Sequence, residues 1–229
     1  MKKLVLLLFI CMFFAAYSGA FAYTITDPPN DAIGVRTFET YGANVYNFSP
    51  GVNSGTISFD LFTNYPQSGL VVGSWATKPA DLFIRESYYG QDYPWAIPLV
   101  NHGIFQTGTM YAVGGFQTSD DMEPSPGGFT YNHDVPVWIS QVGNNYGFSS
   151  IAGGTVTWNP ISGNPDWRVN IPTSIWEEDP NGTFSFTWGT ATCANDVIRS
   201  TPVPEPATMF LLGSGLIGLA GFARRKLKK

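Results

Sequence analysis

The chain has 229 residues, 44% hydrophobic and 13% charged, with a formal net charge of −5 at pH 7. That average hides an uneven distribution, because most positive charges lie at the two ends. Between Tyr23 and Val203 sixteen acidic residues stand against five basic ones, a net charge of about −11. A body this acidic repels nucleic acid and anionic lipid, so neither is an expected partner. The simplest role of the charge is to keep the protein soluble.

The N-terminus has the three parts of an export leader. Lys2 and Lys3 precede an apolar run, and a stretch of small residues then ends in Ala20-Phe21-Ala22. The small side chains of Ala20 and Ala22 suit the pocket of signal peptidase. We therefore predict that residues 1–22 are a signal peptide and that the mature chain begins at Tyr23. The alternative is an uncleaved membrane anchor, which would not need the Ala-x-Ala site.

Residues 23–199 have the length of one domain and show no helical periodicity. Apolar and polar residues alternate in short segments separated by Gly, Pro, Asn and Asp, and Asp179-Pro180-Asn181-Gly182 is typical of a type I turn. This pattern predicts strands at residues 57–61, 71–76, 82–85, 95–100, 109–113, 135–139, 155–158, 167–171 and 184–188. We expect an all-β domain, an antiparallel β-sandwich of jelly-roll type. A β-solenoid would need a fixed repeat, and the sequence has none.

An aromatic segment is the first candidate binding site. Tyr88, Tyr89, Tyr93 and Trp95 lie among Gly, Pro and polar residues, where a loop would expose some of the rings. Flat rings stack on the C–H faces of sugars, so the segment is a candidate carbohydrate site. The alternative is that these rings close one end of the sandwich.

A group of acidic residues is the candidate metal site. Asp120, Asp121 and Glu123 precede a loop rich in Pro and Gly, and their oxygens are ligands that Ca²⁺ accepts. The alternative is a solvated loop without a bound ion. Ca²⁺ is the one cofactor that the sequence suggests.

Catalytic residues are not indicated. The body has two histidines, His102 and His133, and neither stands in the spacing of a zinc site. Paired carboxylates of a glycosidase leave no local pattern, so a secreted hydrolase stays an alternative. Cys11 lies in the predicted leader, which leaves Cys193 without a partner for an intramolecular disulfide. Cys193 is expected to be a small buried side chain, with an intermolecular bridge or a reactive thiol as alternatives.

The C-terminus is apolar and then basic. Residues 207–223 contain no charge, and five of the last six residues are Arg or Lys. A helix of this length spans about 25 Å, slightly less than a hydrocarbon core of about 30 Å. We predict a single transmembrane helix at 207–223 with residues 224–229 as its cytoplasmic tail, which places the body outside.

Pro204-Glu205-Pro206 stands directly before that apolar span, in a Pro-rich linker at residues 200–206. Prolines disfavour helix in the residues before them, so the linker should be extended and accessible to an enzyme. The order Pro-Glu-Pro, hydrophobic helix, basic tail resembles the PEP-CTERM sorting signal of Gram-negative bacteria, which is processed by the membrane enzyme exosortase. The alternative is a Pro-rich spacer before a permanent anchor.

The resemblance implies recognition at Pro204, Glu205 and Pro206, removal of the helix, and release or re-anchoring at the cell surface. It also implies a bacterium that makes exopolysaccharide. Residues 184–198 resemble the last strand of other exosortase substrates, which marks where the domain ends. From all this we expect a non-enzymatic structural or adhesive protein of the cell surface or matrix, which passes through the inner membrane as a single-pass intermediate. A carbohydrate-binding module for exopolysaccharide is the first alternative function.

Overall fold

The structure, a computed structural model, describes most of the predicted body and neither end of the chain. The described residues are 23–28, 31–32, 39–46, 56–72, 75–88, 91–122, 131–145, 147–159, 167–172, 183–192, 194 and 196–200. They form antiparallel β-sheets with one short helix, so the all-β prediction is confirmed. The predicted leader, linker, transmembrane helix and basic tail lie outside them, apart from Ser200, which ends the last strand. Within this described part, no helix is long and apolar enough to cross a membrane.

Five strands form the first sheet, in the order β1-β2-β3-β12-β11. Their bounds are β1 Tyr23–Thr26, β2 Thr40–Tyr46, β3 Thr56–Thr63, β12 Trp167–Pro172 and β11 Thr155–Trp158. All neighbours pair antiparallel, with Phe59 opposite Val45 on one side and Val169 on the other. Each strand alternates apolar and polar residues, so one face of the sheet is apolar.

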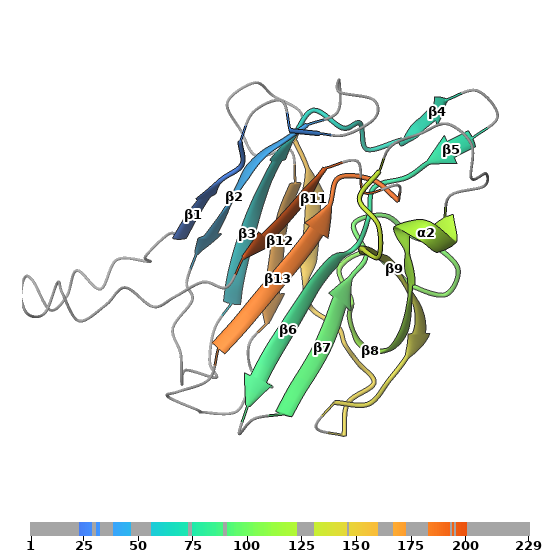
Figure 1. The fold of residues 1–229 in the computed structure, drawn as a ribbon. Helices are drawn as coiled ribbons and strands as arrows, with labels where there is room; N and C mark the ends of the chain where they lie inside the picture. Colours follow the sequence, from blue (N-terminus) through green and yellow to red (C-terminus); the bar gives the residue numbers. More distant parts are fainter. Residues whose placement is uncertain are drawn as a thin grey trace, which may run out of the picture.

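Seven strands form the second sheet, in the order β10-β8-β7-β6-β13-β14, with β9 also paired to β8. Their bounds are β10 Ser150–Ile151, β8 Met110–Thr118, β7 Gln91–Ile97, β6 Leu82–Tyr88, β13 Thr183–Gly189, β14 Val197–Ser200 and β9 Pro136–Val142. Two further strands, β4 Leu70–Val72 and β5 Trp75–Thr77, make a separate hairpin, and α2 spans Ser119–Met122. Figure 1 shows the two large sheets packed face to face.

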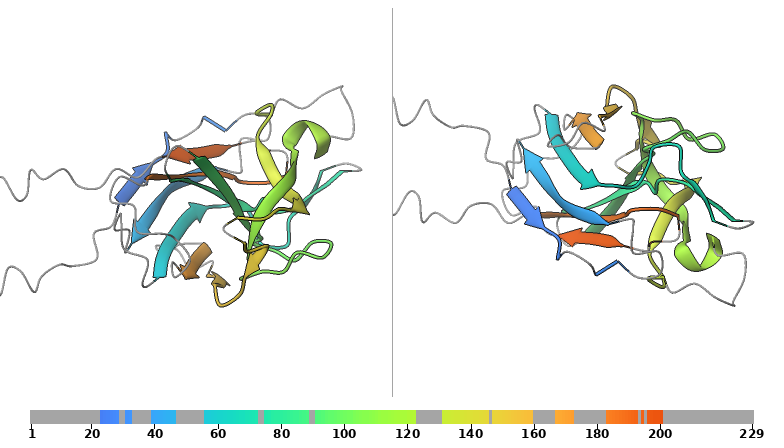
Figure 2. Two further views of the ribbon diagram at one scale, coloured as in Figure 1. Left: turned by 90° about the horizontal axis from the view of Figure 1, so that it is seen from below. Right: turned by 90° about the horizontal axis from the view of Figure 1, so that it is seen from above.

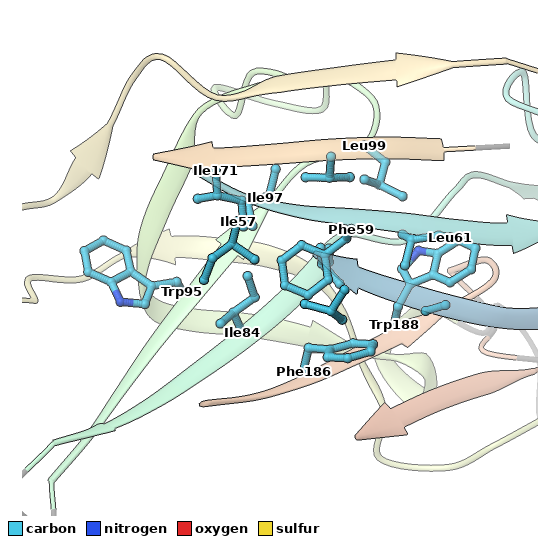
Figure 3. Close-up of a cluster of buried hydrophobic side chains, with 14 of the residues drawn as sticks. Ile57, Phe59, Leu61, Ile84, Trp95, Ile97, Leu99, Ile171, Phe186 and Trp188 are labelled. Carbon is cyan, nitrogen blue, oxygen red and sulfur yellow. The ribbon is translucent and has the colours of Figure 1, made fainter. Parts of the chain in front are cut away.

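The main core lies between these sheets. Phe59 from the first sheet meets Phe186 from the second edge to face, with ring centroids 5.4 Å apart. Figure 3 shows how side chains from both sheets interleave around this pair. Burying one such side chain fully contributes roughly 1.5–3 kcal/mol. The alternation predicted for residues 57–61 and 167–171 is confirmed, because the apolar members of both segments belong to this core.

Several predicted strands differ from those observed. Residues 71–76 were expected as one strand, but they divide into the hairpin β4–β5. Residues 184–198 were expected to end the domain as one strand, but the chain turns between β13 and β14, where Ala194 has a φ of 45°. The segment 88–95 was expected as a loop and instead belongs mostly to the hairpin β6–β7. The strand order does not confirm the jelly-roll connectivity.

The first and last described strands leave the body at one end. Tyr23 begins β1 opposite Val45, whereas Thr40, at the other end of β2, contacts Asp196 just before β14. β14 lies beside β2 and runs away from that contact, so Ser200 lies at the same end as Tyr23. Figure 1 shows β1 on the left of the molecule, and Figure 2 places α2 on the opposite side from β1.

Candidate functional site

A buried carboxylate fixes the last strand before the predicted sorting tail. Asp196 is 4% exposed and stands directly before β14. The backbone N–H of Thr40 donates to its Oδ2 at 2.6 Å, and the N–H of Val197 donates to its Oδ1 at 2.9 Å. Asp196 therefore ties the base of the tail to β2, although 156 residues separate it from Thr40.

Two more carboxylates lie beside Asp196. Asp27, Asp31 and Asp196 each offer an oxygen, and these oxygens lie within 4.8 Å of one another. The hydroxyl of Thr40 lies 2.9 Å from Oδ2 of Asp27 and 2.9 Å from Oδ2 of Asp196. One hydroxyl proton can serve only one of these two acceptors, and negative charges this close repel one another.

Two members of this acidic cluster (Asp27, Asp31 and Asp196) have perturbed pKa values, Asp27 and Asp196. Burial, opposed by the hydrogen bond from Thr40 and helped by the negative charges of Asp196, Asp31 and Glu39, raises the pKa of Asp27 to about 7. Burial also raises the pKa of Asp196. A proton held by Asp27 relieves the repulsion at neutral pH. The same three oxygens are ligands of the type that Ca²⁺ prefers.

This pKa predicts a pH-dependent stability. The folded-state pKa of Asp27 lies above the ordinary value of 3.8, so the folded chain binds more protons than the unfolded chain between about pH 4 and 7. The favourable contribution is therefore complete below pH 4 and is lost as the pH rises through 7. Because Asp27 is partly exposed, we expect a loss of about 1 to 2 kcal/mol.

Urea unfolding of the wild type and of Asp27→Asn at pH 4.5, 6 and 8 measures this effect. The amide resembles the protonated carboxyl, so Asp27→Asn should be more stable than the wild type at pH 8 and similar to it at pH 4.5. Parallel pH profiles for the two proteins would show that Asp27 ionises normally.

The candidate metal residues on α2 are engaged locally. Oδ1 of Asp120 accepts from the hydroxyl of Tyr131 and contacts Nδ1 of His133, each at 2.7 Å, and these contacts lower the pKa of Asp120 to about 2. Asp121 instead accepts from the backbone N–H of Thr118 at 2.8 Å. Glu123 lies outside the described residues. The structure thus joins Asp120 to a tyrosine and a histidine, and Ca²⁺ binding at this place stays a prediction.

His102 is held in an aromatic and acidic environment. Its Nε2 lies 3.0 Å from both carboxylate oxygens of the fully buried Asp81, and its ring stacks on Trp138 with centroids 4.4 Å apart. The backbone N–H of Ile139 also donates to Asp81, at 2.9 Å. Burial raises the pKa of Asp81, while the hydrogen bond and charge of His102 oppose that shift. This group links β6, β9 and the loop before β8.

The aromatic segment has a different geometry from the one predicted. Trp95 is fully buried in the main core, so it does not present a ring to a surface ligand. Tyr88 ends β6 and Tyr93 lies in β7, opposite Glu86. Tyr89 is outside the described residues. Trp95 is therefore a core residue, and a carbohydrate site at Tyr88, Tyr89 and Tyr93 stays a prediction.

Sequence reasoning missed the acidic cluster around Asp196. Its members come from the two ends of the body, so no local spacing reveals them. The only signal was weak: Asp27 and Asp31 stand close together near the predicted mature N-terminus.

Cys193 and residues 201–229 lie outside the described part of the chain, and the comparisons with known proteins bear on the tail. A family model of the PEP-CTERM protein-sorting motif matches residues 202–226. Searches of curated proteins and of solved structures gave no significant match. The matched segment contains Pro204, Glu205, Pro206 and the whole apolar span 207–223. This chain carries a PEP-CTERM protein-sorting motif, the recognition signal of an exosortase-type sorting enzyme.

Proposed function

We propose that this protein is a non-enzymatic structural or adhesive component of the bacterial surface, delivered by exosortase-type processing of its C-terminal tail. The observation that carries the proposal is the match of residues 202–226 to the sorting motif. The motif implies export toward the cell envelope. Signal peptidase would release residues 1–22, and the helix at 207–223 would hold the body at the outer face of the inner membrane until the tail is processed.

The geometry of the body supports this route. Tyr23 and Ser200 lie at one end, so both predicted membrane segments attach to the same side of the domain. Glu205 lies five positions after Ser200 in the sequence, and such a segment spans at most about 18 Å. The sorting enzyme would therefore work close to the folded body, at the end of β14 that Asp196 anchors to β2.

The proposed role is binding or structural because each histidine of the described part is held by a carboxylate. His102 is held by Asp81 and stacked on Trp138, and His133 contacts Asp120. These contacts fix strands and loops in place. The same proposal includes Ca²⁺ as a ligand of the protein. It also includes exopolysaccharide as the matrix that surrounds the protein.

Replacing Pro204, Glu205 and Pro206 together with alanine tests the proposal. The expected result is that most of the protein stays unprocessed in the inner-membrane fraction, because the enzyme loses its recognition element. Immunoblots of inner-membrane, surface and medium fractions measure this. Asp134→Ala removes an exposed acid of the body and serves as the control, which should be displayed like the wild type. Normal surface display of the triple variant would refute sorting by this motif.

A further inference from the structure

The outward face of the first sheet carries an ordered array of polar side chains. One residue in each of the five strands points to the core: Ile25, Val45, Phe59, Val169 and Val156. The residues next to them along each strand point outward. One row crosses all five strands, and a second row crosses four of them. The first row is Thr24, Asn44, Asp60, Arg168 and Thr157, and the second is Tyr46, Ser58, Asn170 and Thr155.

Hydrogen bonds between strands hold the second row in place. The hydroxyl of Ser58 donates to Oδ1 of Asn170 at 2.6 Å, and Nδ2 of Asn170 donates to the hydroxyl of Thr155 at 2.9 Å. Nδ2 of Asn44 donates to the hydroxyl of Tyr46 at 3.1 Å, which joins the two rows. These side chains have lost their rotamer freedom before any ligand arrives, which lowers the entropic cost of binding.

This polar face is electrically neutral within an acidic body. Asp60 is 1% exposed, and its two oxygens accept from Nε and a terminal nitrogen of Arg168 at 2.6 and 2.7 Å. The guanidinium and the carboxylate therefore neutralise each other in a bidentate pair. All other members of the two rows are uncharged. Thr24, Thr155, Thr157 and Arg168 are exposed.

We propose that the polar face formed by these two rows binds a neutral polysaccharide strand laid across β2, β3, β12 and β11. Charge complementarity selects this occupant. An uncharged array of hydroxyls and amides matches sugar hydroxyls, whereas the acidic body repels an anionic polymer. Adjacent strands are about 4.8 Å apart, close to the length of one hexose ring, so each strand can meet one sugar unit.

Two side chains are the expected contact points. Tyr46 offers the only aromatic ring of the two rows and is partly exposed. Oδ1 of Asn44, whose Nδ2 donates to the Tyr46 hydroxyl, is buried and accepts no hydrogen bond, which is a costly state for an amide oxygen. A sugar hydroxyl that enters beside Tyr46 would supply the missing donor. This site lies on the first sheet. The aromatic segment 88–95 belongs mostly to β6 and β7 of the second sheet, so it has no part in the site.

Binding of the full-length exported chain, purified in detergent, to an immobilised array of neutral and acidic glycans tests the proposal. We expect capture by at least one neutral glycan, with little change when the salt concentration rises, because neither the face nor the glycan carries a net charge. Tyr46→Ala and Asn44→Ala, which change the two expected contact points, should each weaken that binding by about 3- to 10-fold, the value of one or two hydrogen bonds.

Ser140→Ala and Gln141→Ala, at exposed positions of β9, are the matched controls and should bind like the wild type. Thermal unfolding checks each variant, and the exposed double change Thr155→Ala with Thr157→Ala replaces any variant that fails to fold. Capture by acidic glycans alone, or by no glycan at all, would overturn the proposal. So would equal glycan binding by the polar-face variants and the control variants, or a protein ligand bound to this face. The assay uses purified protein, so its outcome is independent of whether the tail is sorted.

Discussion

Replacing Asp81 with alanine is expected to lower the free energy of unfolding by about 3 to 5 kcal/mol. The side chain is fully buried and accepts from the backbone N–H of Ile139 while it contacts Nε2 of His102. Its removal leaves a buried donor and a buried imidazole without their partner, and it opens a small cavity. Urea unfolding followed by tryptophan fluorescence measures the change.

Asp81→Asn separates the lost hydrogen bonds from the lost charge. The amide oxygen can still accept from Ile139, and the amide nitrogen can donate to a neutral His102. We expect this variant to lose less than half as much stability as Asp81→Ala. If Asp81→Ala lowers the free energy of unfolding by less than about 1 kcal/mol, the Asp81–His102 pair contributes little. The loop before β8 would then be held by the stack of His102 on Trp138.

Gly42→Ala is expected to lower the free energy of unfolding by about 2 to 4 kcal/mol, because it disturbs the pairing of β1 with β2. Gly42 has a φ of 136° at a register shift in β2. A Cβ at this position would overlap the backbone carbonyl of Ile25 in β1, which cannot move without breaking the sheet. Denaturant unfolding measures the total loss, and amide hydrogen exchange shows whether β1 is released.

Gly103→Ala is the matched control for this change. Gly103 also has a positive φ, of 53°, but a Cβ there would meet no atom within 4 Å. The control therefore carries the backbone strain without the collision, and we expect it to cost about 1 kcal/mol. Equal losses in the two variants would show that the close approach of Ile25 is not the cause.

The regular strands could be predicted from the sequence because burial on one face imposes a period of two. Residues 155–158 and 167–171 show this plainly, since each apolar member packs in the core and each polar member points outward. β2 was missed because its pattern is interrupted at Gly42 and its inward residues include the small Ala43. The turn between β13 and β14 was missed because Ala194, rather than glycine, takes the positive φ.

Some candidate sites could also be predicted from the sequence, and others could not. The tail was predictable because its three parts are contiguous, and the family match confirms the motif. The acidic cluster was not predictable, because Asp196 meets Asp27 only after the domain closes. The polar face was hidden for a related reason. Arg168 and Asp60 are more than a hundred residues apart, and only the pairing of β12 with β3 places them in one row.

The tail is predicted to be removed after export, and intact-mass spectrometry of surface or released protein from the native host tests this removal directly. The predicted mature chain begins at Tyr23 and lacks the apolar span 207–223, so its mass should fall well below the 25.0 kDa of the whole chain. Modifications added to the body are resolved by peptide mapping. Recovery of peptides from residues 207–229 in surface-displayed protein would contradict processing and leave this segment as a permanent anchor.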